Sequence, residues 1–150
     1  MFLGRHDHTV DSKGRLSIPA GHRVEIQRRS EKAPILTTHQ DHLRLYPFDE
    51  WEQIAEKLLS KSSLQPDVEA YQRFVASGAA ECPIDSQGRI LIPPPLRKHA
   101  ELGTKVTVAG VLNKIEIWNT ERYEQEHQKV LARWSEIQRS VDQDSRVEKA

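Results

Sequence analysis

The chain has 150 residues, enough for one medium domain or two small ones, and its 22 Lys and Arg residues balance 22 Asp and Glu residues. The overall charge therefore gives no argument for a nucleic-acid or membrane partner. No run approaches the roughly 18 apolar residues of a membrane-spanning helix, and the N-terminus lacks the long apolar segment of a signal peptide. Cys82 is the only cysteine, which excludes an intrachain disulfide and is typical of a reducing cytosol.

The first half of the chain is predicted to mix short strands with helices. Strands are expected at residues 3–10, 16–18, 35–38 and 43–46, and helices at residues 20–29 and 50–60. Asp49 is the expected N-cap of the second helix, and Glu52 completes a pattern like a capping box.

The second half repeats this order after a helix that Asp67 is expected to cap and Gly78 to end. Strands are expected at residues 79–84, 90–92, 105–109 and 115–118, with a helix through Leu96 and Leu102 that Gly103 stops. A last helix over residues 120–141 carries an apolar stripe of nearly heptad period. The stripe could pack on its own domain or against another protomer, and residues 142–150 are expected to be frayed.

One nine-residue stretch occurs twice in the sequence. Residues 11–19 are DSKGRLSIP and residues 85–93, 74 positions later, are DSQGRILIP. The similarity continues to Arg23 and Arg97, and the later hairpins and helices of the two halves also correspond. The chain is therefore an internal duplication. Each repeat has about 45 residues, near the size at which a separate core is marginal, so we expect the halves to pack as one body.

The residues of the repeated stretch predict a turn followed by a strand. The aspartate side chain can accept hydrogen bonds from backbone N–H groups two residues on, and glycine supplies a positive φ. The strand ends at a proline, which favours the first turn of a helix. Arg15 and Arg89 thus lie where turn and strand meet, and their guanidinium groups can project from a rigid hairpin end. The aspartate and arginine could equally form a purely structural clamp.

Charge is distributed unevenly along the chain. Residues 1–32 hold seven Lys or Arg and four Asp or Glu, a net charge of +3, whereas residues 49–69 have a net charge of −4. The excess positive charge thus accompanies the first copy of the motif.

The two Asp-x-x-Gly-Arg-x-x-x-Pro blocks resemble the MraZ family of bacterial transcriptional regulators, as do residues 46–52 and the length near 150. The resemblance covers residues 1–123. It implies a mainly β fold with capping helices, of the α+β class: a double-split β-barrel formed by two tandem SpoVT–AbrB-type repeats packed as one body. The expected division is repeat 1 at 5–51, a helical connector at 52–78, repeat 2 at 79–123, and a C-terminal helix and tail at 124–150.

The resemblance also implies a function. A ring-shaped homo-oligomer would bind short direct repeats in the promoter of its own division and cell-wall gene cluster, most often as a repressor, in the cytoplasm and on the nucleoid. Double-stranded DNA is the expected partner, with no cofactor and no membrane. The expected DNA-binding residues are Lys13, Arg15 and Arg89, with Asp11, Gly14, Asp85 and Gly88 shaping the turns. His22 departs from the aromatic residue usual before Arg23, which questions the local helix packing.

Two other classes of function remain as alternatives. An enzyme would need a catalytic site. Cys82, however, lacks the sequence signature of a catalytic nucleophile and is better explained as a buried thiol. The spacings His6-x-His8 and His39-x-x-His42 favour structural or surface roles over metal binding, and the acidic residues 49–52 are better explained by helix capping. We therefore expect no catalytic or metal site. A ring-forming assembly protein that does not bind DNA is the second alternative.

Overall fold

The computed structural model describes residues 1–144. These residues fall into two compact units, Met1–Asn119 and a second unit that begins at Thr120. Both copies of the repeated motif lie in the first unit. Within the described residues, no helix is both long enough and apolar enough to span a membrane.

Eight strands form two antiparallel sheets in the first unit. They are β1 (Arg5–Thr9), β2 (Arg15–Ser17), β3 (Ile35–His39), β4 (His42–Tyr46), β5 (Ala80–Glu81), β6 (Arg89–Leu91), β7 (Lys105–Val111) and β8 (Lys114–Asn119). The larger sheet has the order β1-β7-β8-β4-β3-β5, and β2 pairs with β6 in a separate two-stranded ribbon.

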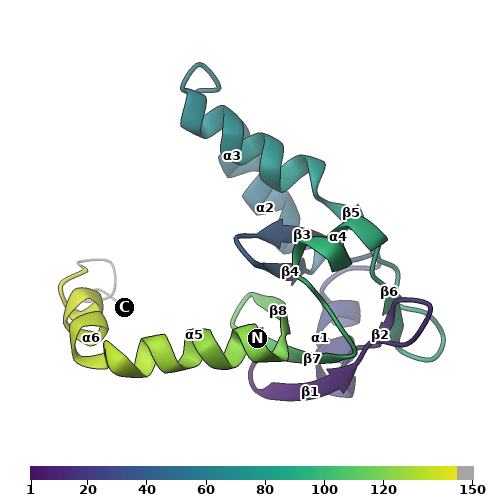
Figure 1. Cartoon of the computed structure of the whole chain (residues 1–150). Coiled ribbons are helices and arrows are strands. Elements are labelled where there is room, and N and C mark those ends of the chain that lie inside the picture. The colour runs from purple at the N-terminus through teal and green to yellow at the C-terminus, as the bar shows by residue number, and fades with distance from the viewer. Residues whose placement is uncertain (145–150) are drawn as a thin grey trace. The chain divides into compact units, whose positions relative to one another are not determined.

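The two repeats exchange strands. β1 of the first repeat pairs with β7 of the second, β5 of the second pairs with β3 of the first, and β4 and β8 pair between them. Each repeat thus completes the sheet of the other, which explains why neither forms a separate unit. Figure 1 shows β2 and β6 side by side, away from the tip where α2 (Phe48–Leu59) and α3 (Pro66–Ser77) meet.

The α+β class predicted from the sequence is confirmed by this antiparallel sheet and its helices. The remaining helices of the described residues are α1 (Ala20–Arg29), α4 (Pro94–His99), α5 (Thr120–Ala132) and α6 (Trp134–Asp142). Within residues 1–144 the strand ladders leave β1 and β5 as edges of the larger sheet. The double-split barrel therefore stays a prediction.

Residues 35–38 of β3 and 106–109 of β7 are buried in unbroken runs, so both faces of these strands are covered, whereas β2 and β6 bury only their central residues. The fully buried side chains come from both repeats and both sheets, so a single core joins the halves. They include Phe2, Leu16, Leu36, Leu43, Leu45, Ile90, Ile92, Val106, Val108, Ile115 and Ile117. Cys82 belongs to this core, and burial raises the pKa of its thiol to about 11. The prediction of a buried thiol is confirmed.

The predicted cap at Asp49 is wrong. α2 begins at Phe48, two residues before the predicted start at residue 50. It follows Pro47, whose fixed φ suits the start of a helix, and no side chain caps it. Asp49 instead accepts hydrogen bonds from Nε and Nη2 of Arg29, and Glu50 accepts one from the same Nη2 at 2.6 Å. The acidic residues therefore hold the end of α1 to the start of α2. Asp67 is likewise inside α3, which begins at Pro66.

Three further boundaries differ from the prediction. The strand expected at residues 79–84 is reduced to β5, and α4 ends at His99, before Leu102. The single helix expected over residues 120–141 is two helices, because Arg133 has φ −116° and ψ 17° and interrupts the helical geometry. The apolar side chains of the predicted stripe remain at least partly exposed, Trp134 at 55%.

His39 lies at the end of β3, where burial and the positive charge of Arg44 lower the pKa of its imidazole to about 4 from an ordinary value of 6.5. His42 pairs with it across the β3–β4 hairpin, stacks on Trp118 at 4.1 Å and lies 3.3 Å from a Glu116 oxygen. The described residues contain no group of three or more potential metal ligands.

Stability is expected to fall as the pH drops from about 6.5 to about 4. The unfolded His39 binds a proton near 6.5 but the folded residue resists it down to about 4, so protons favour the unfolded state in that range. Urea unfolding of the wild-type protein at several pH values should show this fall, and His39→Gln should reduce it. Equal pH dependence of the two proteins would contradict the assignment.

Candidate nucleic-acid interface

The first copy of the repeated motif is a tight turn held by one carboxylate. Oδ1 of Asp11 accepts hydrogen bonds from the backbone N–H groups of Lys13 and Arg15, both at 2.9 Å, and Oδ2 accepts one from Nε of Arg15 at 2.7 Å. The chain reverses through Gly14, whose φ is +84° and whose N–H donates to the Asp11 carbonyl. The turn therefore orients the guanidinium of Arg15.

The second copy has the same geometry. Oδ1 of Asp85 accepts from the N–H groups of Gln87 and Arg89 at 2.9 Å, and its Oδ2 accepts from Nε of Arg89 at 3.1 Å. Gly88 has φ +79° and donates to the Asp85 carbonyl. In both copies, the aspartate side chain and the positive-φ glycine lie in the turn, and the aspartate–arginine contact forms a local clamp.

Both aspartates are held in the ionised form. Backbone hydrogen bonding from Arg15 is the largest cause that lowers the pKa of Asp11 to about 2, and the Arg89 amide lowers the pKa of Asp85 in the same way. Each aspartate bonds only the Nε side of its arginine. Within the described residues, the Nη1 and Nη2 groups of Arg15 and Arg89 have no hydrogen-bond partner, so each can donate to an external acceptor.

The two arginines lie on one face of the β2–β6 ribbon. Arg15 pairs with Leu91 and Ser17 with Arg89, while Leu16 and Ile90 pair between them and are buried in the core. Since side chains alternate along a strand, the outer face of the ribbon is shared by Arg15, Ser17, Arg89 and Leu91. Arg15 and Arg89 are diagonal neighbours on it, a relation that places their Cα atoms about 7–8 Å apart.

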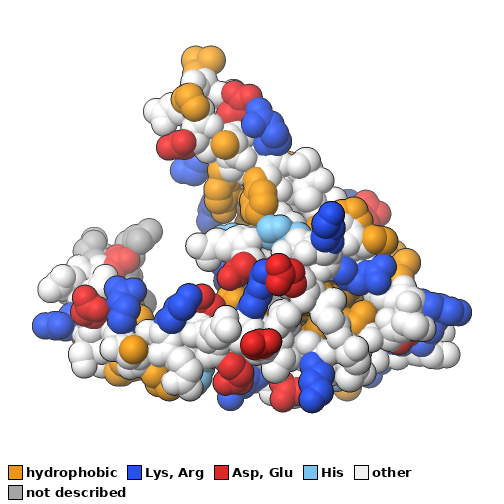
Figure 2. All heavy atoms as spheres, viewed as in Figure 1, with side chains coloured by type: hydrophobic (Ala, Val, Ile, Leu, Met, Phe, Trp, Pro, Cys, Tyr) orange, Lys and Arg blue, Asp and Glu red, His pale blue; other side chains and the backbone are white. Residues whose placement is uncertain are grey.

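This face combines exposure with positive charge. The Arg15 side chain is 32% exposed, that of Arg89 is 24% exposed, and Lys13 is exposed in the first turn. Figure 2 shows Lys and Arg side chains in the part of the first unit where the β2 and β6 turns lie. A two-stranded ribbon fits the major groove of DNA, and arginine can donate two hydrogen bonds to guanine O6 and N7.

Comparison with known proteins agrees with the duplication. The model of a family described as "MraZ protein, putative antitoxin-like" matches residues 1–74 and again residues 75–147. The chain belongs to the MraZ family. The two matches correspond to the two copies of the motif.

Curated MraZ relatives match over most of the chain. "Transcriptional regulator MraZ" of Caldanaerobacter subterraneus is 40% identical over 143 residues, 95% of this chain and 97% of the relative. The protein of the same name from Desulfitobacterium hafniense is 44% identical over 120 residues, 79% of this chain and 81% of the relative. That of Haemophilus influenzae is 44% identical over 121 residues, 79% of this chain and 80% of the relative.

His22, where MraZ resemblance leads us to expect an aromatic residue, is buried. Its ring lies edge-on to that of Phe2 at 5.5 Å and to that of His6 at 5.7 Å. Burial is the main cause that lowers the pKa of His22, and α1 continues without interruption through this residue, from Ala20 to Arg29.

Two arginines near the turns were not among the predicted site residues. Arg23 lies on α1 and Arg97 on α4, and each side chain lies against the glycine of the other repeat's turn. Their correspondence between the two repeats was visible in the sequence. That each arginine reaches the opposite turn was not predictable from the sequence, because this contact depends on how the repeats exchange strands.

Proposed function

We propose that this chain is a sequence-specific, DNA-binding transcriptional regulator whose β2–β6 ribbon enters the major groove. The observation that carries the proposal is the outer face of that ribbon, where two arginines are held by aspartates at Nε and keep their Nη groups for an external ligand. The names of the MraZ relatives support the same function.

In the proposed complex, Arg15 donates two hydrogen bonds to a guanine, which contributes about 1–3 kcal/mol of discrimination. Arg89 contacts a second base or a nearby phosphate. Lys13 contacts phosphate as a point charge and adds affinity without base preference. Asp11 and Asp85 do not contact DNA, since phosphate would repel them, and their role is to orient the arginines.

The two halves of the ribbon differ in ways that favour an asymmetric DNA site. Lys13 in the first turn corresponds to Gln87 in the second, and Ser17 corresponds to Leu91, which is 57% exposed. A ribbon with unequal halves binds the two directions of a DNA site with different energies. Direct repeats, in which every site has the same orientation, suit such a ribbon better than a palindrome.

One ribbon offers a small contact surface, so we propose that several copies act together. A ring of protomers would place ribbons on successive promoter repeats about 10 bp apart, and each additional contact would benefit from a high effective concentration. By resemblance, the target is the promoter of the protein's own division and cell-wall gene cluster, the effect is repression, and the location is the cytoplasm and nucleoid.

An assembly protein without DNA binding is the second candidate. The observation that favours it is the exposed apolar side chains of α5 and α6, among them Leu131 at 54%, Trp134 and Val141. Such side chains suit contacts between protomers, which a DNA-binding ring also requires.

A gel-shift experiment with the region upstream of the protein's own operon separates the two candidates. We expect a shifted complex that unlabelled operator competes away and that a shuffled sequence of equal length and composition does not. Equal competition by the shuffled DNA, or no complex at all, would contradict the proposed function.

Replacing Lys13 with alanine should make DNA binding less sensitive to salt. Loss of one phosphate contact lowers the slope of log K against log salt concentration by about 0.9 per protomer engaged. Fluorescence anisotropy titrations at several salt concentrations measure the slope, and Gln87→Ala is the matched control at the uncharged position. An unchanged slope for Lys13→Ala would exclude the phosphate contact.

A further inference from the structure

We infer that Arg23 and Arg97 are positioning residues that act between the repeats, each fixing the DNA-binding turn of the other half. The inference rests on the proposed function for its consequence in DNA binding, but the contacts themselves are independent of it. Arg97 lies against Gly14 of the first turn, and Arg23 lies against Gly88 of the second. Neither arginine is on the ribbon.

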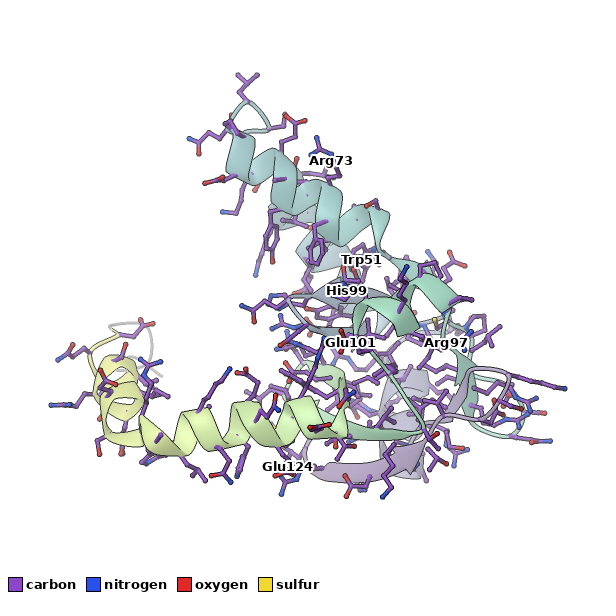
Figure 3. The ribbon with its side chains drawn as sticks, viewed as in Figure 1. Trp51, Arg73, Arg97, His99, Glu101 and Glu124 are labelled. Atoms are coloured by element: carbon purple, nitrogen blue, oxygen red, sulfur yellow. The ribbon has the colours of Figure 1, made fainter. Side chains whose placement is uncertain are left out.

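Two contacts hold the guanidinium group of Arg97 in place. It lies on α4 (Figure 3), and its Nε donates a hydrogen bond to the Ile92 carbonyl at 3.0 Å. Its guanidinium then covers Gly14 so closely that a Cβ atom there would lie 2.7 Å from Cζ and 2.9 Å from Nε. Glycine is therefore required at position 14 for two reasons, the positive φ and the space that the guanidinium occupies.

Arg23 makes the equivalent contact in the second turn. A Cβ atom on Gly88 would lie 2.6 Å from Cζ of Arg23 and 2.8 Å from its Cδ. The Nε of Arg23 is buried and has no hydrogen-bond partner within the described residues. Burial of an unpaired donor has a cost, and the close packing of this side chain on Gly88 offsets part of it.

The backbone ties the same glycines to the opposite repeat. The Ile18 N–H donates to the Gly88 carbonyl, and the Ile92 N–H donates to the Gly14 carbonyl, both at 2.9 Å. Each turn glycine is thus held on one side by a strand end of the other repeat and covered by the other repeat's arginine. The aspartate sets the shape of the turn, and the opposite half sets its position.

This arrangement makes the two DNA-binding turns depend on each other's repeat. A turn that is held before DNA arrives loses less conformational entropy on binding. Arg97 should therefore act on Arg15, and Arg23 on Arg89, although each pair lies in different repeats. The competing explanation is that Arg23 or Arg97 contacts phosphate directly. It predicts no effect of one repeat's arginine on the turn of the other repeat.

The first test needs no DNA. In Arg97→Met, which keeps the aliphatic stem and removes the guanidinium, we expect the amides of Lys13 and Arg15 to exchange with solvent roughly tenfold faster or more by NMR. The amides of Gln87 and Arg89 should keep their wild-type rates, and Arg23→Met should give the reverse. Faster exchange only in the mutated repeat, or no change in either turn, would overturn the inference.

The second test measures DNA affinity in double mutants. In the Arg97→Met background, Arg15→Ala should lose most of its effect while Arg89→Ala keeps its full effect, because only the first turn is already displaced. Arg97→Lys separates packing from charge: lysine keeps the charge but lacks the planar guanidinium, so we expect it to behave like methionine.

The outcomes distinguish the inference from the proposed function. Wild-type affinity in Arg97→Lys, with unchanged turn amides, would show that the planar guanidinium is not required and would overturn the inference. Absence of specific DNA binding by the wild-type protein would overturn the proposed function. The amide-exchange experiment would still test whether Arg97 and Arg23 hold the opposite turns. Circular dichroism checks folding, and if Arg97→Met does not fold, Arg97→Lys provides the same exchange measurement.

Discussion

Replacing Arg15 with alanine is expected to abolish specific binding to the promoter repeats while the fold and the oligomer remain intact. Within the described residues, the Arg15 side chain bonds only Asp11, so its Nη groups can donate to an external acceptor such as a guanine. Loss of a bidentate guanine contact costs about 1–3 kcal/mol, or about 5- to 150-fold in affinity, at each engaged copy. The losses multiply when several copies bind one promoter.

Anisotropy titration with operator DNA measures this loss, and sedimentation velocity measures the oligomer. Arg28→Ala is a matched control, since Arg28 is an exposed arginine on α1 whose guanidinium pairs with Glu25 at 2.8 Å, outside the ribbon. We expect it to bind operator like the wild-type protein. Wild-type affinity in Arg15→Ala would contradict the assignment of the interface.

Replacing Asp11 with alanine should also weaken DNA binding strongly, although it removes a negative charge from the proposed DNA-binding face. Simple electrostatics predicts tighter binding. The structure predicts the opposite, because the Asp11 carboxylate holds two backbone amides and Nε of Arg15, so its loss frees both the turn and the arginine. We expect a loss of about tenfold or more per engaged copy, close to that of Arg15→Ala.

Asp7→Ala is the control for charge alone. Asp7 lies on β1, and its Oδ1 accepts a hydrogen bond from Thr107, so removing it changes the same net charge without touching the turn. Asp11→Asn should lie between the wild-type protein and Asp11→Ala, because an amide oxygen can still accept the backbone N–H groups. Tighter operator binding by Asp11→Ala than by the wild-type protein would show that charge, not turn geometry, dominates.

Local features of the fold were predictable because each depends on neighbouring residues. The Asp11 and Asp85 turns follow from the hydrogen-bonding reach of aspartate and the positive φ of glycine. The predicted helix at residues 20–29 coincides with α1, and the two later hairpins follow from alternating apolar residues. The helix starts were less accurate: Asp49 and Asp67 resemble N-caps, but a proline at Pro47 or Pro66 starts each helix earlier.

The amino-acid sequence by itself determined that the protein is a duplication, that each half carries an arginine after an aspartate–glycine turn, and that the later hairpins of the two halves correspond. Only the tertiary structure decided that β2 pairs with β6, that β1 and β5 are exchanged, and that Arg23 and Arg97 reach the opposite turns. The physical reason is the separation along the sequence over which each kind of interaction acts. Turn chemistry and strand alternation act over a few residues, whereas partner choice depends on burying one shared core between segments about 74 residues apart.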